Sequence, residues 1–178
     1  MKVISTLTRP RFILTFLIAV ILCQIAFLFL YRALAAEGVP TTLDMMTGFT
    51  PQAARDHIKL YSNEAFRLLN WFQMVDLVFP AAYGLMFAGL TARFLGTLRP
   101  GSPRLVLLAL VAPVGAVFDL CENVGIFIMV RVFPESIILP ARLTAVVGIV
   151  KYVLITAALL LCAGLGVALL VKRIRARA

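Results

Sequence analysis

Four long apolar segments constrain this chain more than any other feature of its sequence. They cover about residues 12–31, 71–92, 105–130 and 143–171. A helix needs about 20 apolar residues to cross a hydrocarbon core of about 30 Å, and each segment reaches that length. Because lipid offers no partner for free backbone N–H and C=O groups, we expect all four segments to be helices. The fourth is long enough to cross at a tilt.

The composition agrees with a membrane protein. Of the 178 residues, 62% are hydrophobic and only 14% are charged, and the mean hydropathy is +1.03. A soluble domain is usually about half apolar and carries more charge on its surface. We therefore expect a single integral membrane domain over residues 1–178, folded as an all-α, polytopic four-helix bundle.

Basic residues cluster near both chain ends and between the second and third apolar segments. They are Lys2, Arg9, Arg11, Arg93, Arg99, Arg104, Lys172, Arg173, Arg175 and Arg177. Because basic loops stay in the cytoplasm, both termini are predicted to be cytoplasmic, in a multi-pass protein of a bacterial inner membrane. Membrane lipids are the expected partners of these residues, and the net charge of +9 is not taken to indicate nucleic-acid binding.

The start of the chain shares features with a signal peptide. Basic residues precede an apolar stretch, and ALAAEG follows at residues 33–38. The apolar stretch of about 19 residues exceeds the usual signal-peptide core, and Arg32 lies just before the small residues. We therefore expect the first segment to remain as an uncleaved helix.

The segment at residues 33–70 is then predicted to lie outside the cytoplasm and to hold an amphipathic helix over about residues 50–69. Thr50 can cap this helix, and Pro51 suits its first turn. Apolar residues repeat along one face. They are Ala54, Ile58, Tyr61, Ala65 and Leu68. The helix is expected to connect two spans along the outer surface, to cover the bundle mouth as a lid, or to contact a partner protein.

The third apolar segment contains FDLCENVG at residues 118–125. Asp119, Glu122 and Asn123 are spaced i, i+3 and i+4, so they share one helix face. Charged groups at this depth are costly unless they face the bundle interior and find partners there. The other segments offer Gln24, Gln73, Asp76, Tyr83, Lys151 and Tyr152.

These polar groups lie at similar depths. Counted from the outer end of each helix, Gln24, Glu122 and Lys151 are each about 12–14 Å deep. We therefore predict one polar pocket in the outer half of the bundle. Its carboxylates outnumber its lysine, so a proton on one carboxyl, an arginine reaching down from the rim, or a bound cation should compensate the excess.

Four functions fit such a pocket. The first is binding of a small lipid-like or amine-bearing amphiphile, with the carboxylates holding the head and aromatic side chains forming an apolar slot. That slot would be lined by Phe72, Phe79, Tyr83, Phe118 and Phe127. The second is proton- or cation-coupled transport, which in so short a chain would require a homo-oligomer.

Two further functions remain open. Carboxyls in different protonation states, or a desolvated Lys151, could perform acid–base or nucleophilic catalysis. Alternatively, the polar groups only tie the helices together, with Lys151 paired to Glu122 or Asp119. No serine triad, HExxH or P-loop pattern occurs, and no cofactor or metal site is predicted. His57 is expected at the surface, and the three cysteines are interpreted as small core residues.

Two resemblances add to this interpretation. The helix that starts at Thr50, DLVFPAAYG at 76–84 and DLCEN at 119–123 resemble small bacterial four-span membrane proteins of uncharacterised function that carry a D-x-x-E-N motif. This likeness covers about residues 48–155 and implies no function. The layout is also similar to the EXPERA-type family, with four spans, cytoplasmic termini, a long first outer loop and buried acids.

The EXPERA likeness carries a functional implication. WFQMVDLVFP at 71–80 resembles the start of that family's second span. Its members include sterol isomerases and a receptor for hydrophobic amines. The resemblance therefore implies a pocket for an amphiphile and gives Asp76 the part of a ligand-contacting acid.

Overall fold

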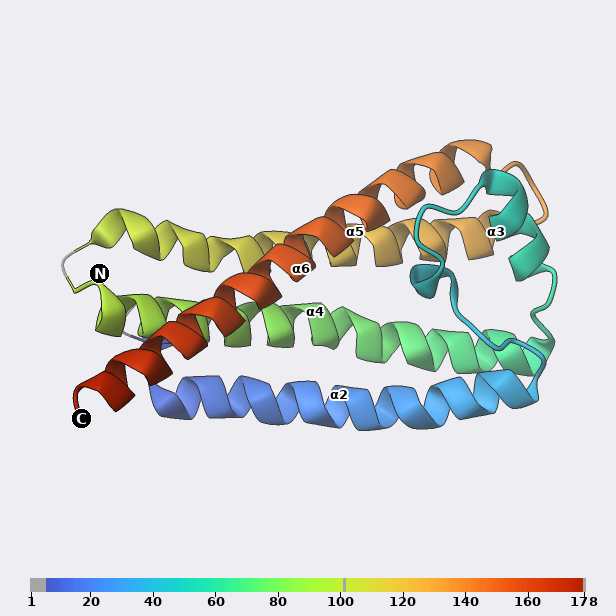
Figure 1. The fold of residues 1–178 in the computed structure, drawn as a ribbon. Helices are drawn as coiled ribbons and strands as arrows, with labels where there is room; N and C mark the ends of the chain where they lie inside the picture. The colour runs from blue at the N-terminus through green and yellow to red at the C-terminus, as the bar shows by residue number, and fades with distance from the viewer. Residues whose placement is uncertain (1–5, 101, 178) are drawn as a thin grey trace.

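The computed structural model describes residues 6–100 and 102–177, without the side chains of 103–106. In that part of the chain all regular structure is helical. The α-helices are α2 (Pro10–Ala36), α3 (Pro51–Ile58), α4 (Asn63–Leu98), α5 (Val111–Val132) and α6 (Ile138–Arg175). Two 3₁₀-helices, η1 (Leu43–Met45) and η2 (Pro103–Leu110), lie before α3 and α5. Figure 1 shows the long helices side by side in one bundle.

The all-α fold is confirmed for the described residues, and four helical stretches are long and apolar enough to cross a membrane. They are Pro10–Ala36, Asn63–Leu98, Leu107–Val132 and Ile138–Arg175. The connection between α5 and α6 is short, because Pro140 lies in the first turn of α6, where its missing N–H is not needed. With 38 residues, α6 is about 57 Å long, and it crosses the other helices diagonally (Figure 1).

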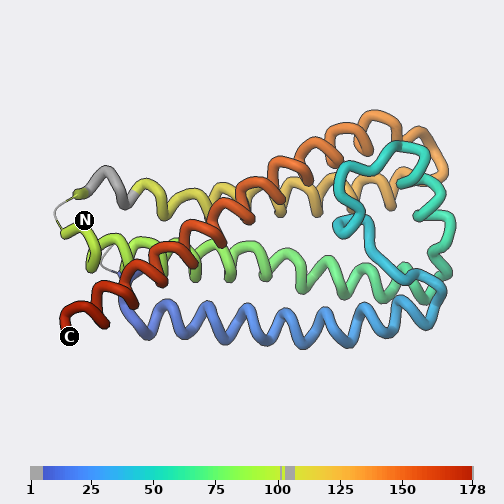
Figure 2. Tube along the Cα trace, in the orientation of Figure 1, coloured from blue at the N-terminus to red at the C-terminus, as the bar shows by residue number. Residues whose placement is uncertain are grey.

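The bundle has two distinct ends. We call the end that holds α3 the loop end, and the end that holds both chain termini the terminal end (Figures 1 and 2). The basic side chains described at the terminal end are Arg9, Arg11, Arg93, Arg99, Lys172, Arg173, Arg175 and Arg177. Lys2 and the side chain of Arg104, which belong to the same predicted basic set, lie outside the described part of the chain.

The single amphipathic helix predicted over about residues 50–69 does not form. Residues 59–62 interrupt it, and its second half belongs to the span helix α4. The Ser62 hydroxyl accepts a hydrogen bond from the Ala65 N–H (3.0 Å) and so caps α4. The same hydroxyl donates to the Glu37 carboxylate (2.7 Å). This contact with a residue 25 positions away helps to fix the break, and a local helical pattern does not show it.

The apolar stripe of that segment is nevertheless buried. Thr50 caps α3 as predicted, accepting a hydrogen bond from the Ala53 N–H (3.1 Å). α3 then lies against the loop end, and the Arg55 guanidinium donates to the backbone carbonyls of Pro134 (2.6 Å) and Glu135 (3.2 Å). The buried stripe residues are Ala54, Ile58, Tyr61 and Ala65, with Leu68 half-buried.

Packing between the long helices is uneven. α5 and α6 form the most extensive pair, and α4 packs against α2, α5 and α6. In the described part of the chain, α2 makes its extensive contacts with α4 alone. Much of α2 is therefore exposed to the surroundings, as expected for a helix whose outer face meets lipid.

Candidate functional site

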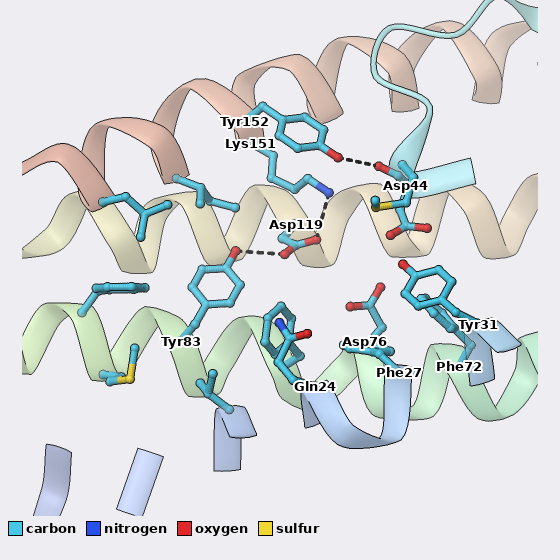
Figure 3. Close-up of a pocket in the computed structure, with 17 residues that line it drawn as sticks. Gln24, Phe27, Tyr31, Asp44, Phe72, Asp76, Tyr83, Asp119, Lys151 and Tyr152 are labelled. Atoms are coloured by element: carbon cyan, nitrogen blue, oxygen red, sulfur yellow. Dashed lines mark hydrogen bonds and ion pairs between the residues drawn. The ribbon is translucent and has the colours of Figure 1, made fainter. Parts of the chain in front are cut away.

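A cavity of about 540 Å³ lies among the four long helices and beneath η1 (Figure 3). Its volume falls within the usual range for small-molecule sites. Eight polar side chains line it: Gln24, Tyr31, Asp44, Asp76, Tyr83, Asp119, Lys151 and Tyr152. Six of them are residues that the sequence assigned to a common pocket. Glu122, Asn123 and Gln73, which were assigned to the same pocket, do not line this cavity.

Lys151 is the centre of an ion-pair cluster. Its Nζ atom lies 3.4 Å from Oδ1 of Asp119 and forms a second ion pair with the Glu122 carboxylate. Asp119 also accepts a hydrogen bond from the Tyr83 hydroxyl (2.9 Å). All four side chains are buried, with Glu122 only 2% exposed. One positive charge thus faces two carboxylates in a low-dielectric interior.

Glycines on α5 and α6 permit this cluster to form. A Cβ atom at Gly148 would overlap the Glu122 carboxylate, and one at Gly125 would overlap the Thr144 hydroxyl. Small residues at these positions let the two helices approach closely, as is common in membrane bundles. Glu122 therefore lies between α5 and α6, behind the cavity wall rather than in the cavity.

Asn123 has a structural partner that explains its position. Pro80 lies inside α4 and lacks the N–H that would normally bond the carbonyl of Asp76, four residues earlier. The Asn123 side-chain amide donates to that carbonyl instead (3.0 Å). An amide on α5 thus replaces a missing helical hydrogen bond of α4, at the residue whose side chain enters the cavity. Asn123 therefore positions the backbone of Asp76.

The carboxylate of Asp76 differs from the other buried acids. It faces the cavity and is 7% exposed. Among the described residues, none donates a hydrogen bond to it or forms an ion pair with it. A buried carboxylate without a partner is costly unless it is protonated, hydrated or bound to a cation.

The segment between α2 and α3 supplies cavity residues that the sequence did not indicate. η1 folds back into the bundle, where the Tyr152 hydroxyl donates to the backbone carbonyl of Asp44 (2.9 Å). The Thr42 hydroxyl, just before η1, donates to the side-chain hydroxyl of Tyr31 (3.4 Å). Irregular backbone at this depth is tolerated because the protein surrounds it. The sequence feature that could have indicated this is LDMM at residues 43–46, where Asp44 lies among apolar residues within a polar loop.

Aromatic rings form much of the cavity wall. Phe27 lies against Phe72 and Phe79, with ring centroids 4.7 and 5.4 Å apart, and Phe79 lies 5.2 Å from Tyr83. Three of the five aromatic residues predicted to form a slot, Phe72, Phe79 and Tyr83, therefore line the cavity.

Phe118 and Phe127, the other two residues of the predicted slot, do not line the cavity. Phe127 is 44% exposed and lines a separate groove of about 630 Å³ between α4 and α5. Gln73 and Asn123 line the same groove. The prediction placed all these residues on one interior surface because helical spacing alone cannot distinguish adjacent interior and exterior faces.

The rim arginines do not compensate the acidic excess. Arg67 donates to Glu64 (2.6 Å), and the Arg131 guanidinium stacks 5.0 Å from the Phe127 ring centroid. Arg142 is exposed. Of the described cations, Lys151 alone lies within ion-pair distance of the buried carboxylates. The described side chains also contain no group of three or more His, Cys, Asp or Glu arranged to hold a metal ion.

His57 is buried, and its predicted surface position is wrong. The imidazole is 7% exposed and packs edge-on against Tyr61, with ring centroids 5.4 Å apart. Burial lowers the pKa of His57 because the charged imidazolium loses its hydration. The cysteine prediction holds for Cys23 and Cys162, whereas Cys121 is exposed on the outer surface of the bundle.

The fold and site together describe a polytopic helical membrane protein with an acidic internal cavity. No family model, curated protein or solved structure matches this chain. The cavity residues themselves therefore provide the basis for a functional proposal.

Proposed function

We propose that the cavity binds a small lipid-like molecule with an amine head. The observation that carries this proposal is the unpartnered carboxylate of Asp76, which is buried and faces the cavity. An ammonium group would donate hydrogen bonds to that carboxylate and supply the missing positive charge. Charge-assisted hydrogen bonds of this kind are among the stronger polar contacts in proteins.

The local charge supports a cationic ligand. Asp44, Asp76 and Asp119 line the cavity, and Glu122 lies directly behind it. These are four of the chain's eight acidic residues, and Lys151 forms ion pairs with two of them, Asp119 and Glu122. A bound ammonium would reduce the negative excess.

The aromatic wall supports an amphiphile rather than a bare ion. Tyr31 and Phe72 lie edge to face, with ring centroids 5.0 Å apart, beside the acidic side chains. Ring faces attract cations, and the same rings bury apolar ligand surface. The cavity therefore offers both a place for a positive head and a contact surface for an apolar body.

A purely structural role accounts for part of the polar cluster. Glu122 pairs with Lys151 between two helices, and Asn123 replaces the hydrogen bond that Pro80 cannot make. These contacts support the alternative that buried polar groups hold the helices together. That alternative gives no partner to Asp76, which is why ligand binding accounts for more of the site.

We further propose that the terminal end faces the cytoplasm of a bacterial inner membrane. The concentration of basic side chains at that end supports this orientation under the positive-inside rule. The loop end, with α3 and the nearby cavity, would then face outward.

The proposal is tested by measuring dodecylamine binding to the purified protein in lipid nanodiscs, by native mass spectrometry and by isothermal titration. Asp76→Asn should weaken binding at least tenfold, because a charge-assisted contact is lost. Glu64→Gln is the matched control, since Glu64 lies in the same helix but pairs with Arg67 away from the cavity. Equal binding by wild type and Asp76→Asn would contradict the proposal.

A further inference from the structure

The exposed lining residues show where the cavity opens. Gln24 on α2, Met45 on η1 and Leu159 on α6 line the cavity and are exposed, Met45 by 58% and Leu159 by 45%. By contrast, the lining residues of α4 and α5 are buried or half-buried. The mouth therefore lies between α2 and α6, which make no extensive contact with each other in the described chain. The floor is made by α4 and α5 (Figure 3).

This mouth lies at the depth of the hydrocarbon core. Arg11 and Arg32 are 21 residues apart on α2, about 31 Å along the helix, which matches a core of about 30 Å. Gln24 lies between them, eight residues from Arg32, or about 12 Å inside that boundary. An opening beside Gln24 consequently faces lipid chains and not the aqueous phase.

The loop end of the cavity is covered. Thr42 and Leu43 are each 1% exposed, so the start of η1 packs tightly over this end, whereas Met45 at the end of η1 is exposed at the mouth. The hydrogen bond from Tyr152 to the Asp44 carbonyl ties η1 to α6, and Thr42 ties it to Tyr31 on α2. A ligand arriving from water would have to displace this cover, whereas a ligand in the bilayer meets the open side directly.

The lining changes from acidic to apolar along the bundle axis. Asp44 and Asp76 lie toward the loop end. Toward the terminal end, the lining residues are Val20, Met86, Phe87, Ile155 and Leu159. A molecule with a charged head and a flexible chain matches this gradient, with its head near Asp76 and its chain along the apolar part.

The geometry points to a lipid-borne ligand, an amine carrying a single alkyl chain, that enters sideways from the bilayer between α2 and α6. This inference rests on the proposed amine-binding function and adds the chain and the route. If the inference is right, affinity depends on the length of the ligand's alkyl chain and on the apolar residues at the mouth, such as Leu159. A site for free, water-borne amines would depend on neither.

The test compares butylamine and dodecylamine on the full-length protein in nanodiscs. Dodecylamine should bind at least tenfold more tightly, and Leu159→Trp should weaken dodecylamine binding at least tenfold, and by a larger factor than it weakens butylamine binding. Leu160→Trp is the matched control, because Leu160 is 70% exposed and does not line the cavity. Equal binding of the two amines, both dependent on Asp76, would overturn the lateral-entry inference and leave the proposed function standing. If neither amine bound in an Asp76-dependent way, both would fail.

A second measurement tests the mouth without any ligand. A nitroxide attached at Gln24→Cys, in a chain whose three native cysteines are replaced by alanine, reports collisions with oxygen and with a water-soluble nickel chelate. Oxygen should reach it readily and the chelate should not, because oxygen concentrates in lipid. Free access of the chelate would show a water-filled mouth and overturn lateral entry from the bilayer.

Discussion

Replacing Lys151 should destabilise the bundle more than any other single charge change. Lys151→Met leaves Glu122 and Asp119 as buried carboxylates without their cation, and these side chains are only 2% and 6% exposed. Removing one partner of a buried ion pair costs about 3–5 kcal/mol, because the remaining charge stays desolvated. We expect a loss of that size in the free energy of unfolding.

A second substitution separates lost charge pairing from lost packing. Glu122→Gln in the Lys151→Met background removes the more deeply buried of the two unpaired charges. Asp119 keeps the hydrogen bond from Tyr83 and faces the cavity, where it can be hydrated. The double variant should therefore recover more than half of the stability lost in the single variant, a strong coupling between adjacent sites.

Trp71 provides the readout. It is the only tryptophan and is 64% exposed near the start of α4. Its fluorescence can follow SDS-induced unfolding in mixed micelles for the wild type, the single variant and the double variant. Wild-type stability in Lys151→Met would refute the ion-pair argument. A double variant as unstable as the single one would assign the loss to packing.

Three further predictions concern the backbone and the loop end. Gly148→Ala should cost about 1–3 kcal/mol of stability by overpacking the paired glutamate, whereas Gly164→Ala, with open space around its Cβ, should be neutral in the same unfolding titration. Asn123→Leu should cost about 1–3 kcal/mol by leaving a buried carbonyl unpaired, and adding Pro80→Ala should restore much of it, because the new backbone N–H can bond that carbonyl; no recovery would refute the replacement role. The folded pKa of His57 lies below its ordinary value, so the unfolded state binds more protons as the pH falls below about 6.5. Stability should therefore fall from pH 7.5 to 5.5, and His57→Gln should flatten this dependence in hydrogen-exchange measurements on α3.

The number of spans and the interior polar face could be predicted from the sequence. Apolar segment length determines how many helices can cross a membrane, and the spacing of Asp119, Glu122 and Asn123 determines which face they share. The pairing of Lys151 with either Asp119 or Glu122 was one of the open alternatives, and the structure shows both contacts. These features follow from helical periodicity and the cost of isolated charge.

The rest of the site depends on contacts between distant residues. Asp44 lines the cavity because η1 is held inside the bundle by a hydrogen bond from the hydroxyl of Tyr152, 108 positions later in the chain. The break before α4 involves a bond between Ser62 and Glu37. The missing donor at Pro80 could be recognised from the sequence, because the i to i−4 rule is local. The donor that replaces it, the side-chain amide of Asn123, could not be predicted, because it reaches the Asp76 carbonyl only through the packing of α5 against α4.

The position of Lys151 on the last helix has a consequence for biosynthesis. α5 leaves the ribosome before α6, and it is the less apolar of the two helices. An aspartate near the centre of an isolated span costs roughly 2.5–3.5 kcal/mol during insertion by the translocon. The lysine that pairs with its acids arrives only with α6, so the two helices should enter the bilayer together as a hairpin. We expect a nascent chain that stops before Ile138 to be retained at the translocon or degraded.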